Sequence, residues 1–568
     1  MTNFAAQKEC IFKMKRLVMA TLLSVICLAV SAIPAKRGWY VLTLADGTEV
    51  KAQLTGDEHL HYWLTEDGRR LSWQGERLEE TDMARMQQKA ASRRAVRETA
   101  SAARRAVSMG EHTSYKGQKR GLVILAQFTD VKFKTANNQA KYQKIMNAEN
   151  YTTSEGFVGS VADYFRAQSG GLFEIAFDVV GPYTLSNNQK YYGENDEDGY
   201  DMRAHEMIVE GCRLAEAEVD FADYDWDGDG EADQVYVIYA GKGEADGGSS
   251  VANTVWPHMW TLYDAMGETL TLDGIMVNTY ACSNEIDRDG HIEGIGSICH
   301  EFSHCLGYPD IYDTLGDNYA MGSYDLMSGG NYNGDSFVPA GYSAYEKWMA
   351  GWIDLTPLSA ESVSESSLKP VSEGGEGYII YNDGHPDEYF IVENRQLTNW
   401  DAELPGHGLM VTQVDFDEDI WEWNIPNAFV TESESKDEDG IYYGFPANDH
   451  LRLTILTADN KPSYYSEQND LFPYGKKDSL TYNSKPAARF YNDNLQGTRR
   501  LPGSLHNIAE NADGTMRFDY VADDVASGIH SAHITSNSTL FFDLYGRRIQ
   551  MPRKGLYIRN QKKFLPRK

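Results

Sequence analysis

Residues 300–310 read His-Glu-Phe-Ser-His-Cys-Leu-Gly-Tyr-Pro-Asp, and this stretch decides how the centre of the chain is interpreted. Four residues turn an α-helix by about 400°, so His300 and His304 lie one above the other on one helix face. That spacing lets both imidazoles reach one zinc ion, with Glu301 beside it as a general base. The stretch therefore predicts a metal centre carried by a helix.

The residues around this motif support a helix and a third ligand. Apolar residues recur at helical spacing, and they predict a helix over 294–306. Gly307 is the residue type that ends a helix in a left-handed conformation, so the chain can reverse there. The next segment then offers Asp310 as the best-placed third zinc ligand and Asp313 as the alternative. A buried histidine pair with a purely structural role is the competing interpretation.

A second segment, residues 323–330, reads Ser-Tyr-Asp-Leu-Met-Ser-Gly-Gly. It predicts a tight, glycine-bounded turn that contains Met327. Metzincin-type peptidases place such a methionine beneath their metal. Without the upstream zinc motif, a methionine beside two glycines would indicate only a buried turn.

These residue types are suited to the hydrolysis of peptide bonds. Zinc held by three protein ligands keeps a further position for a water molecule and lowers the pKa of that water. Glu301 would accept a proton from this zinc-bound water and pass it to the leaving amine. Tyr324 and Tyr332 are candidates for stabilising the oxyanion.

With these residues identified, the chain resembles the immune inhibitor A family (M6) of secreted zinc metallopeptidases, in which Asp stands where other metzincins have a third His. The resemblance covers roughly residues 120–460, and the zinc motif is its specific part. It implies an α+β, metzincin-like catalytic domain in which His300, His304 and Asp310 bind zinc. It also implies that Glu301 is catalytic and that Met327 lies in the Met-turn. Four further stretches carry the resemblance: Gly121–Asp130, Ser160–Phe165, Val179–Pro182 and Glu393–Gln396.

An acidic loop precedes the zinc motif and contains the pattern D-x-D-x-D-G-x-x-D. Alternating carboxylates can surround a hard cation with oxygen, and Gly230 permits the sharp turn. A strand over 234–239 follows instead of an EF-hand helix, so the pattern predicts a structural calcium site. A solvated acidic turn is the alternative. The predicted ligands are the side chains of Asp225, Asp227, Asp229 and Asp233 and the backbone carbonyl of Glu231.

The N-terminal residues indicate export. Residues 17–30 form an apolar run that follows Lys13, Lys15 and Arg16 and ends at Val30-Ser31-Ala32, which predicts a signal peptide over 1–32. The run is too short to span a membrane comfortably, and no later segment is long and apolar enough to do so. We therefore expect a protein that is secreted or held at the cell surface.

The rest of the chain is predicted to be modular. The region after the signal has alternating strands and turns at Asp46-Gly47 and Asp67-Gly68, then an Ala-rich helix and basic pairs that suit propeptide cleavage. The final segment contains Phe541–Ile549 and Lys554–Arg559 and ends in a basic tail. It resembles sorting domains of the bacterial type IX secretion pathway, which implies contact with that machinery; a stray hairpin is the alternative. The predicted modules are a propeptide over 33–118, a catalytic domain over 119–352, a strand-rich β-sandwich domain over 353–522 and a C-terminal sorting segment over 523–568.

Composition and isolated residues narrow the function classes. The net charge of −32 makes nucleic acid an unexpected partner and favours solubility. Four cysteines remain after the signal, too few for a disulfide scaffold; Cys282 and Cys299 either pair or stay as buried thiols. His258 lies between aromatic residues and is interpreted as packed or hydrogen-bonded.

The catalytic domain is predicted to have strands at 121–128, 172–180, 234–240 and 274–281 and helices at 158–168 and 201–218, with a short aromatic helix at 342–352.

The sequence thus predicts a secreted, zinc-dependent endopeptidase that cleaves extracellular proteins and is made as a proenzyme. The alternative is a surface binding or adhesion protein that uses a peptidase-like domain for recognition. The intact set of Glu301, the two histidines and Asp310 favours the enzyme.

Overall fold

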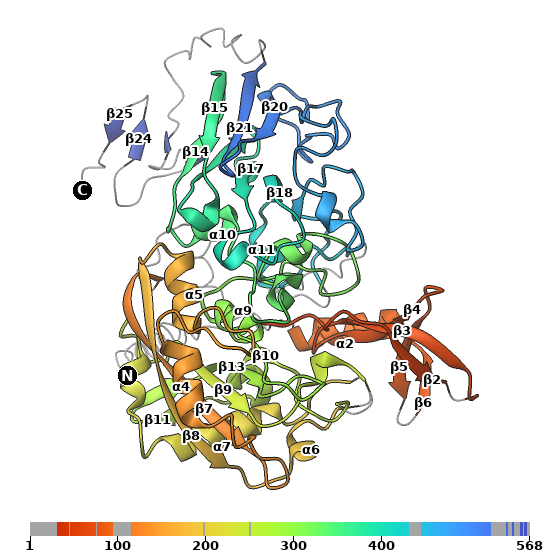
Figure 1. Cartoon of the computed structure of the whole chain (residues 1–568), viewed down its shortest axis with the longest axis vertical. Coiled ribbons are helices and arrows are strands. Elements are labelled where there is room, and N and C mark those ends of the chain that lie inside the picture. The colour runs from red at the N-terminus through yellow and green to blue at the C-terminus, as the bar shows by residue number, and fades with distance from the viewer. Residues whose placement is uncertain are drawn as a thin grey trace, which may run out of the picture.

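The computed structural model contains a mixed arrangement of helices and several β-sheets (Figure 1). It describes residues 31–44, 46–74, 77–94, 115–196, 199–248, 251–430 and 445–523, together with four short strands between 541 and 564. Most of the predicted signal peptide lies outside the described residues. Within the described part of the chain, no helix is long and apolar enough to cross a membrane.

A six-stranded sheet, in the order β1-β10-β13-β9-β7-β8, forms the centre of the region predicted to be catalytic, residues 119–352, which is called the catalytic region below. Four neighbouring strands, β13, β9, β7 and β8, run parallel, whereas β10 is antiparallel to β13 and β1 is antiparallel to β10. The strands are β1 (Ser31–Ala32), β7 (Gly117–Gln127), β8 (Phe173–Thr184), β9 (Val235–Tyr239), β10 (His258–Thr261) and β13 (Thr279–Asn284).

Helices cover both faces of this sheet, because successive strand residues point to opposite sides. In β7, Val123 and Leu125 enter the core that contains α9, whereas Leu122 and Ile124 enter the core formed with α7. The first face therefore supports the helix that carries the zinc motif. The helices are α4 (Gln139–Asn147), α5 (Val161–Gln168) and α9 (Gly296–Cys305) on that face, and α7 (Ala204–Ala215) on the other.

Most predicted elements of this region are confirmed to within a few residues, with one correction. A single strand was expected over 274–281, but the chain forms β12 (Ile275–Val277), paired with β11 (Leu270–Leu272), and then β13. The break falls at Asn278, whose buried side chain accepts a hydrogen bond from the Tyr263 N–H at 3.0 Å. This long-range contact separates two strands that look continuous in the sequence.

Of the two alternatives left open for Cys282 and Cys299, the structure has buried thiols and no disulfide, and the four cysteines of the described residues are free thiols. Cys282 lies in the core shared with α7, and Cys299 lies in the core on the other face of the sheet. The two residues are close in the sequence but separated by the sheet, so their thiols remain buried and unpaired.

The region after residue 352 consists mainly of two sheets that share a core. The five-stranded sheet has a second buried face, which packs with α10 (Ala344–Met349) against the catalytic region. The first sheet contains β14 (Leu355–Pro357), β16 (Gly377–Tyr381), β17 (Glu388–Arg395), β18 (Gly408–Asp415) and β19 (Leu453–Ile455); the second contains β15 (Val363–Leu368), β21 (Met516–Ala522) and β20 (Gly503–Glu510).

The N-terminal region is an antiparallel meander of five strands followed by a helix. Both predicted Asp-Gly turns are confirmed, since Gly47 and Gly68 each have a φ of 83°. The elements are β2 (Tyr40–Thr43), β3 (Glu49–Gly56), β4 (His61–Thr65), β5 (Arg70–Gln74), β6 (Arg77–Glu80) and α2 (Met83–Arg94).

The C-terminal part contributes one small sheet of four short strands, which Figure 1 shows apart from the larger sheets. It contains β22 (Phe541–Phe542), β23 (Arg548–Ile549), β24 (Tyr557–Arg559) and β25 (Lys562–Phe564).

Candidate metal centre and its cleft

Helix α9 brings the two histidines of the motif into the interior. Its first residue, Gly296, lies so close to the backbone that an added Cβ would be 1.8 Å from the Asn331 carbonyl oxygen, so only glycine is accommodated. The helix ends before Gly307, whose φ of 86° is the left-handed conformation predicted for its C-terminus. Both ends of the helix are therefore fixed by local glycine geometry.

The side chains of His300, His304 and Asp310 form one fully buried cluster. The Nε2 atom of His300 lies 3.0 Å from Nε2 of His304 and 3.1 Å from Oδ1 of Asp310. The third separation, from Nε2 of His304 to Oδ1 of Asp310, is 3.3 Å. Three ligand atoms about 2.0–2.2 Å from a tetrahedral zinc ion lie roughly 3.3 Å apart, so this donor set fits zinc.

The other ring nitrogen of each histidine is held by a backbone carbonyl. Nδ1 of His300 donates to the Leu326 carbonyl at 2.8 Å, and Nδ1 of His304 donates to the Tyr308 carbonyl at 2.7 Å. These bonds require a proton on Nδ1, which leaves both Nε2 lone pairs directed into the cluster. Burial also lowers the pKa of His304, which favours the neutral, metal-binding form.

Asp310 is fixed by a residue from far along the chain. The Asn424 Nδ2 group donates to Oδ2 of Asp310 at 2.6 Å, and the backbone N–H of Asp310 donates to Oδ1 of Asn424, also at 2.6 Å. Burial disfavours ionisation of Asp310, but the two neighbouring imidazoles outweigh it and hold its pKa below the usual range. The carboxylate is therefore charged, and only Oδ2 is used by Asn424.

Asp313, the alternative third ligand, lies outside this cluster. Its carboxylate accepts hydrogen bonds from the backbone N–H groups of Leu315 at 3.0 Å and Asn318 at 3.1 Å. Burial raises the pKa of Asp313 to about 6. Asp313 thus stabilises the turn after the motif, and Asp310 is the residue that accompanies the histidines.

Met327 is fully buried, and the backbone of its turn contacts the segments that carry the metal ligands. The residue before it, Leu326, provides the carbonyl that holds His300, and the Met327 carbonyl accepts the Ile311 N–H at 2.7 Å. Asp325 holds the same turn from its other side, since its Oδ1 accepts the Met327 N–H at 2.8 Å. The turn connects the histidine helix to the segment that carries Asp310.

Glu301 is fully buried, and one of its oxygens contacts a segment from the start of the chain. The backbone N–H of Ile33 donates to Oε1 of Glu301 at 2.6 Å, across 268 residues of sequence. Burial, reinforced by the negative charge of Asp310, raises the pKa of Glu301 well above its ordinary value. A buried carboxylate that faces a peptide nitrogen is placed to exchange a proton with that nitrogen.

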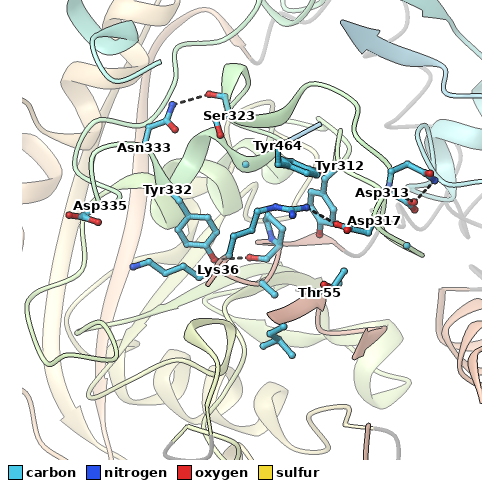
Figure 2. A pocket seen from close by; sticks show the side chains of 18 residues that line it. Lys36, Thr55, Tyr312, Asp313, Asp317, Ser323, Tyr332, Asn333, Asp335 and Tyr464 are labelled. Atoms are coloured by element: carbon cyan, nitrogen blue, oxygen red, sulfur yellow. Dashed lines mark hydrogen bonds and ion pairs between the residues drawn. The ribbon is translucent and has the colours of Figure 1, made fainter. Parts of the chain in front are cut away.

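We call residues 31–37 the cleft segment, because they extend past Glu301 as a bound peptide would. Its first two residues form β1 and pair with β10, the antiparallel strand next to β13. Further on, the Trp256 indole donates to the Ile33 carbonyl at 3.0 Å. The Tyr332 hydroxyl donates to the Pro34 carbonyl at 2.7 Å (Figure 2). The Lys36 N–H donates to the Ala245 carbonyl at 2.9 Å. Backbone groups along the segment are thus recognised irrespective of its side chains.

Three candidate residues outside the metal cluster, Tyr324, Tyr332 and His258, lie in different surroundings. Tyr332 lies at the cleft segment, whereas the Tyr324 hydroxyl donates to the Glu467 carbonyl at 2.7 Å. The interpretation of His258 as a packed residue is confirmed: Nδ1 donates to the Trp256 carbonyl at 2.7 Å, and Nε2 accepts from the Tyr280 hydroxyl at 3.1 Å. Burial lowers the pKa of His258 to about 4, so it is neutral.

The acidic loop brings together only part of its predicted ligand set. Carboxylate oxygens of Asp225, Asp227 and Asp229 lie within 4.8 Å of one another. Asp233 lies outside that group, and its carboxylate accepts the Trp226 N–H at 2.5 Å. The Glu231 side chain is buried, and burial raises its pKa to about 7.

Two features of this site could not be identified from the motif. Asn424 is one of many asparagines, and nothing in its immediate sequence indicates contact with a residue 114 positions earlier. The cleft segment was assigned to the predicted signal and propeptide, without a contact to Glu301. The sequence feature that could have indicated a bound segment is Pro34, which favours the extended backbone that a bound peptide needs.

Comparisons with known proteins find similarity to metallopeptidases. Residues 112–354 match the family model described as Immune inhibitor A peptidase M6, catalytic domain. The chain is 28 % identical over 263 residues to the pre-pro-metalloprotease PrtV of Vibrio cholerae serotype O1, covering 40 % of this chain and 28 % of that protein. It is 24 % identical over 308 residues to immune inhibitor A of Bacillus thuringiensis subsp. alesti, covering 45 % and 44 %. The chain spans less than half the length of either relative, and the matches support a metallopeptidase.

Proposed function

We propose that the protein is a secreted, zinc-dependent endopeptidase that cleaves extracellular proteins and is made as a proenzyme. In this proposal His300, His304 and Asp310 bind the zinc ion and Glu301 is the general base. The proposal includes a metzincin-like catalytic domain with Met327 in its Met-turn, followed by a β-sandwich domain. The match over 112–354 and the two related metalloproteases support the peptidase class.

The position of the Ala32–Ile33 peptide bond is the observation that carries the proposal. Its nitrogen is 2.6 Å from Glu301, the residue next to His300, and the segment before it pairs with strand β10. A peptidase needs its substrate bond within hydrogen-bond reach of the acid–base residue, with the flanking backbone held extended. The cleft segment meets both requirements, and this is the arrangement expected for a polypeptide substrate.

The chain's own residues account for the proton transfers. A bound zinc ion would supply a Lewis acid and an activated water. Glu301 is buried and would take a proton from the attacking water and deliver it to the nitrogen that occupies the Ile33 position. Trp256 and Tyr332 hold the two carbonyls after that nitrogen, so the leaving strand is oriented while the bond breaks.

The same contacts support a latent precursor. The segment from Ile33 onward lies at Glu301 and is held by Trp256 and Tyr332, so it excludes other polypeptides from the cleft. Ile33 and Ala35 are buried in a core made mostly by the N-terminal strands, together with Ala245 and Trp256. We therefore propose that residues 33–118 act as a propeptide whose release opens the cleft. N-terminal sequencing of the active, secreted protein tests this, and a mature start at Ile33 would refute it.

Two further parts of the proposal concern a second metal site and the export of the protein. The loop with Asp225, Asp227 and Asp229 is proposed to bind a structural calcium ion, supported by the proximity of these carboxylates. The segment 523–568 is proposed to direct export through a type IX pathway. Normal export of a protein truncated before residue 541 would contradict that role.

A single substitution tests the proposed reaction. Glu301→Gln keeps the size of the side chain but removes its ability to accept a proton, so hydrolysis of casein should fall by about 10²–10⁴-fold. Glu388→Gln, a buried carboxylate in β17 that accepts the Asn492 N–H and lies outside the metal cluster, is the control and should retain activity. Casein binding without cleavage by the wild-type, zinc-loaded protein would instead favour the adhesion function.

A further inference from the structure

The cleft segment ends in two adjacent cations, Lys36 and Arg37, which are seated against residues from other parts of the chain. Nη2 of Arg37 lies 2.8 Å from Oδ1 of Asp317, and the guanidinium carbon lies 3.2 Å from the centre of the Tyr464 ring. This combines an ion pair with a cation–π contact. The segment therefore places a basic side chain in a site that is complementary in both charge and shape.

Lys36 occupies a second site on the same wall. Its Nζ atom is 3.8 Å from Oδ1 of Asp246 and 5.7 Å from the centre of the Tyr332 ring. The Asp246 side chain is more than nine-tenths buried, and its Oδ2 has no hydrogen-bond partner among the described residues. Glu293 and Asp335 add to the negative field at Lys36. A buried carboxylate of this kind is stabilised by a cation in the cleft.

The walls of both sites lie outside the propeptide. Asp246, Tyr332, Asp317 and Tyr464 come from the catalytic region and the region after it. Tyr332, Asp317 and Tyr464 line a cavity of about 280 Å³ beside the segment, which Thr55 of the propeptide region also lines (Figure 2). Asp317 lies on the turn that Asp313 stabilises. Tyr464 packs edge-on against Tyr319, with ring centres 4.9 Å apart. These supports do not involve the cleft segment, so the Arg37 site is retained when the segment leaves.

We infer that this wall is a pair of substrate subsites for basic side chains, at the fourth and fifth residues after the cleaved bond. Ile33 follows the bond presented to Glu301, so Lys36 and Arg37 occupy these two places. The preferred substrates are then extended polypeptides with Lys or Arg in both positions. This inference rests on the proposed endopeptidase and names the substrate class that its cleft selects.

The test uses the active, secreted protein and two fluorescein-labelled heptapeptides. One has the sequence of residues 33–39, Ile-Pro-Ala-Lys-Arg-Gly-Trp, and the other has Gln-Gln in place of Lys-Arg. Both begin after the cleaved bond, so fluorescence anisotropy measures their binding independently of hydrolysis. We expect the Lys-Arg peptide to bind about five- to tenfold more tightly, as one ion pair and one cation–π contact support.

Two substitutions then test whether Asp317 causes the preference for the Lys-Arg peptide. Asp317→Asn should reduce the ratio of the two dissociation constants to about two, with little change for the Gln-Gln peptide, because it removes only the ion pair with the fifth residue. Asp493→Asn changes net charge equally at an exposed position outside the cavity and should leave the ratio unchanged. Equal binding of the two peptides by the wild type, or an unchanged ratio in Asp317→Asn, would overturn the inference.

Casein hydrolysis by the same preparation separates this inference from the proposed function. Hydrolysis together with equal binding of both peptides would refute the basic subsites and leave the endopeptidase intact. A Lys-Arg preference without any hydrolysis would support the subsites and contradict the proposed reaction.

Discussion

The two clusters proposed to bind metal ions differ in how their ligands are held. In the zinc cluster, His300 is held by a carbonyl 26 residues away and Asp310 by Asn424, 114 residues away. In the acidic loop, the carboxylates of Asp225 and Asp227 accept backbone N–H groups only two to five residues ahead. The first site is assembled by the tertiary fold, whereas the second is assembled by its own turn.

This difference predicts how strongly metal binding at each site depends on residues elsewhere in the chain. Ligands oriented by distant groups depend on the packing of several regions, so their metal affinity is sensitive to residues outside the motif. A loop closed by its own backbone depends mainly on its own sequence and on the bound cation. The predictions below test this contrast in order of decreasing effect.

The largest effect is expected from removing a zinc ligand. His304→Ala should lower the zinc content from about one ion per chain to near zero and abolish casein hydrolysis, because two ligands do not hold zinc against competing chelators. Elemental analysis and a casein assay on the same preparation measure both quantities. Asp227→Asn is the matched change in the acidic loop, and it should retain both zinc and activity at low temperature.

A smaller effect is expected from Asn424→Ala, which removes both hydrogen bonds to Asp310. Freed from this contact, the carboxylate can rotate away from the histidines, and zinc affinity should fall by about 10–100-fold. Competition with a fluorescent zinc chelator measures the affinity without depending on activity.

The control for this substitution is Asn448→Ala. Asn448 is also buried, and its Nδ2 group donates to the carbonyls of Ile425 and Ala428, but it has no contact with Asp310. It should lower thermal stability and leave zinc affinity unchanged. Equal zinc affinities for the two variants would show that Asn424 supports only the local fold.

The smallest effect is expected from calcium at the acidic loop. A cation present at about 100 times its dissociation constant stabilises a fold by about 2.7 kcal/mol, so its removal with zinc restored should lower the melting temperature by about 5–10 °C. Differential scanning calorimetry of the wild type and of Asp227→Asn measures this. An unmoved melting temperature in the wild type would indicate a solvated turn without a bound ion.

The same contrast explains what the sequence predicted. The helix expected over 294–306 and observed over 296–305, its glycine-limited end and the approach of Asp310 follow from local spacing and conformational preference, and all were expected. The strands β7, β8 and β9 were also predicted from their apolar runs, and the strand expected over 274–281 is broken at Asn278, whereas β10 was not predicted. Each of these features is determined mainly by neighbouring residues.

Features that depend on distant contacts were not predicted. The cleft segment meets Glu301 across 268 residues, and Asn424 meets Asp310 across 114 residues. Cys282 and Cys299 were considered as a disulfide, because their separation by the sheet is visible only in three dimensions. Sequence patterns report which residue types a site requires, whereas the side chains that orient those residues are selected by the assembled fold.

The most direct test of the central claim is the zinc content and the casein hydrolysis rate of Glu301→Gln, measured on one activated preparation beside the wild type. We predict about one zinc ion per chain in both proteins and a loss of about 10²–10⁴-fold in hydrolysis by the variant, because the metal ligands are intact and only the proton acceptor is missing. Hydrolysis at the wild-type rate by the zinc-loaded variant would contradict the assignment of Glu301 and the reaction proposed for this cleft.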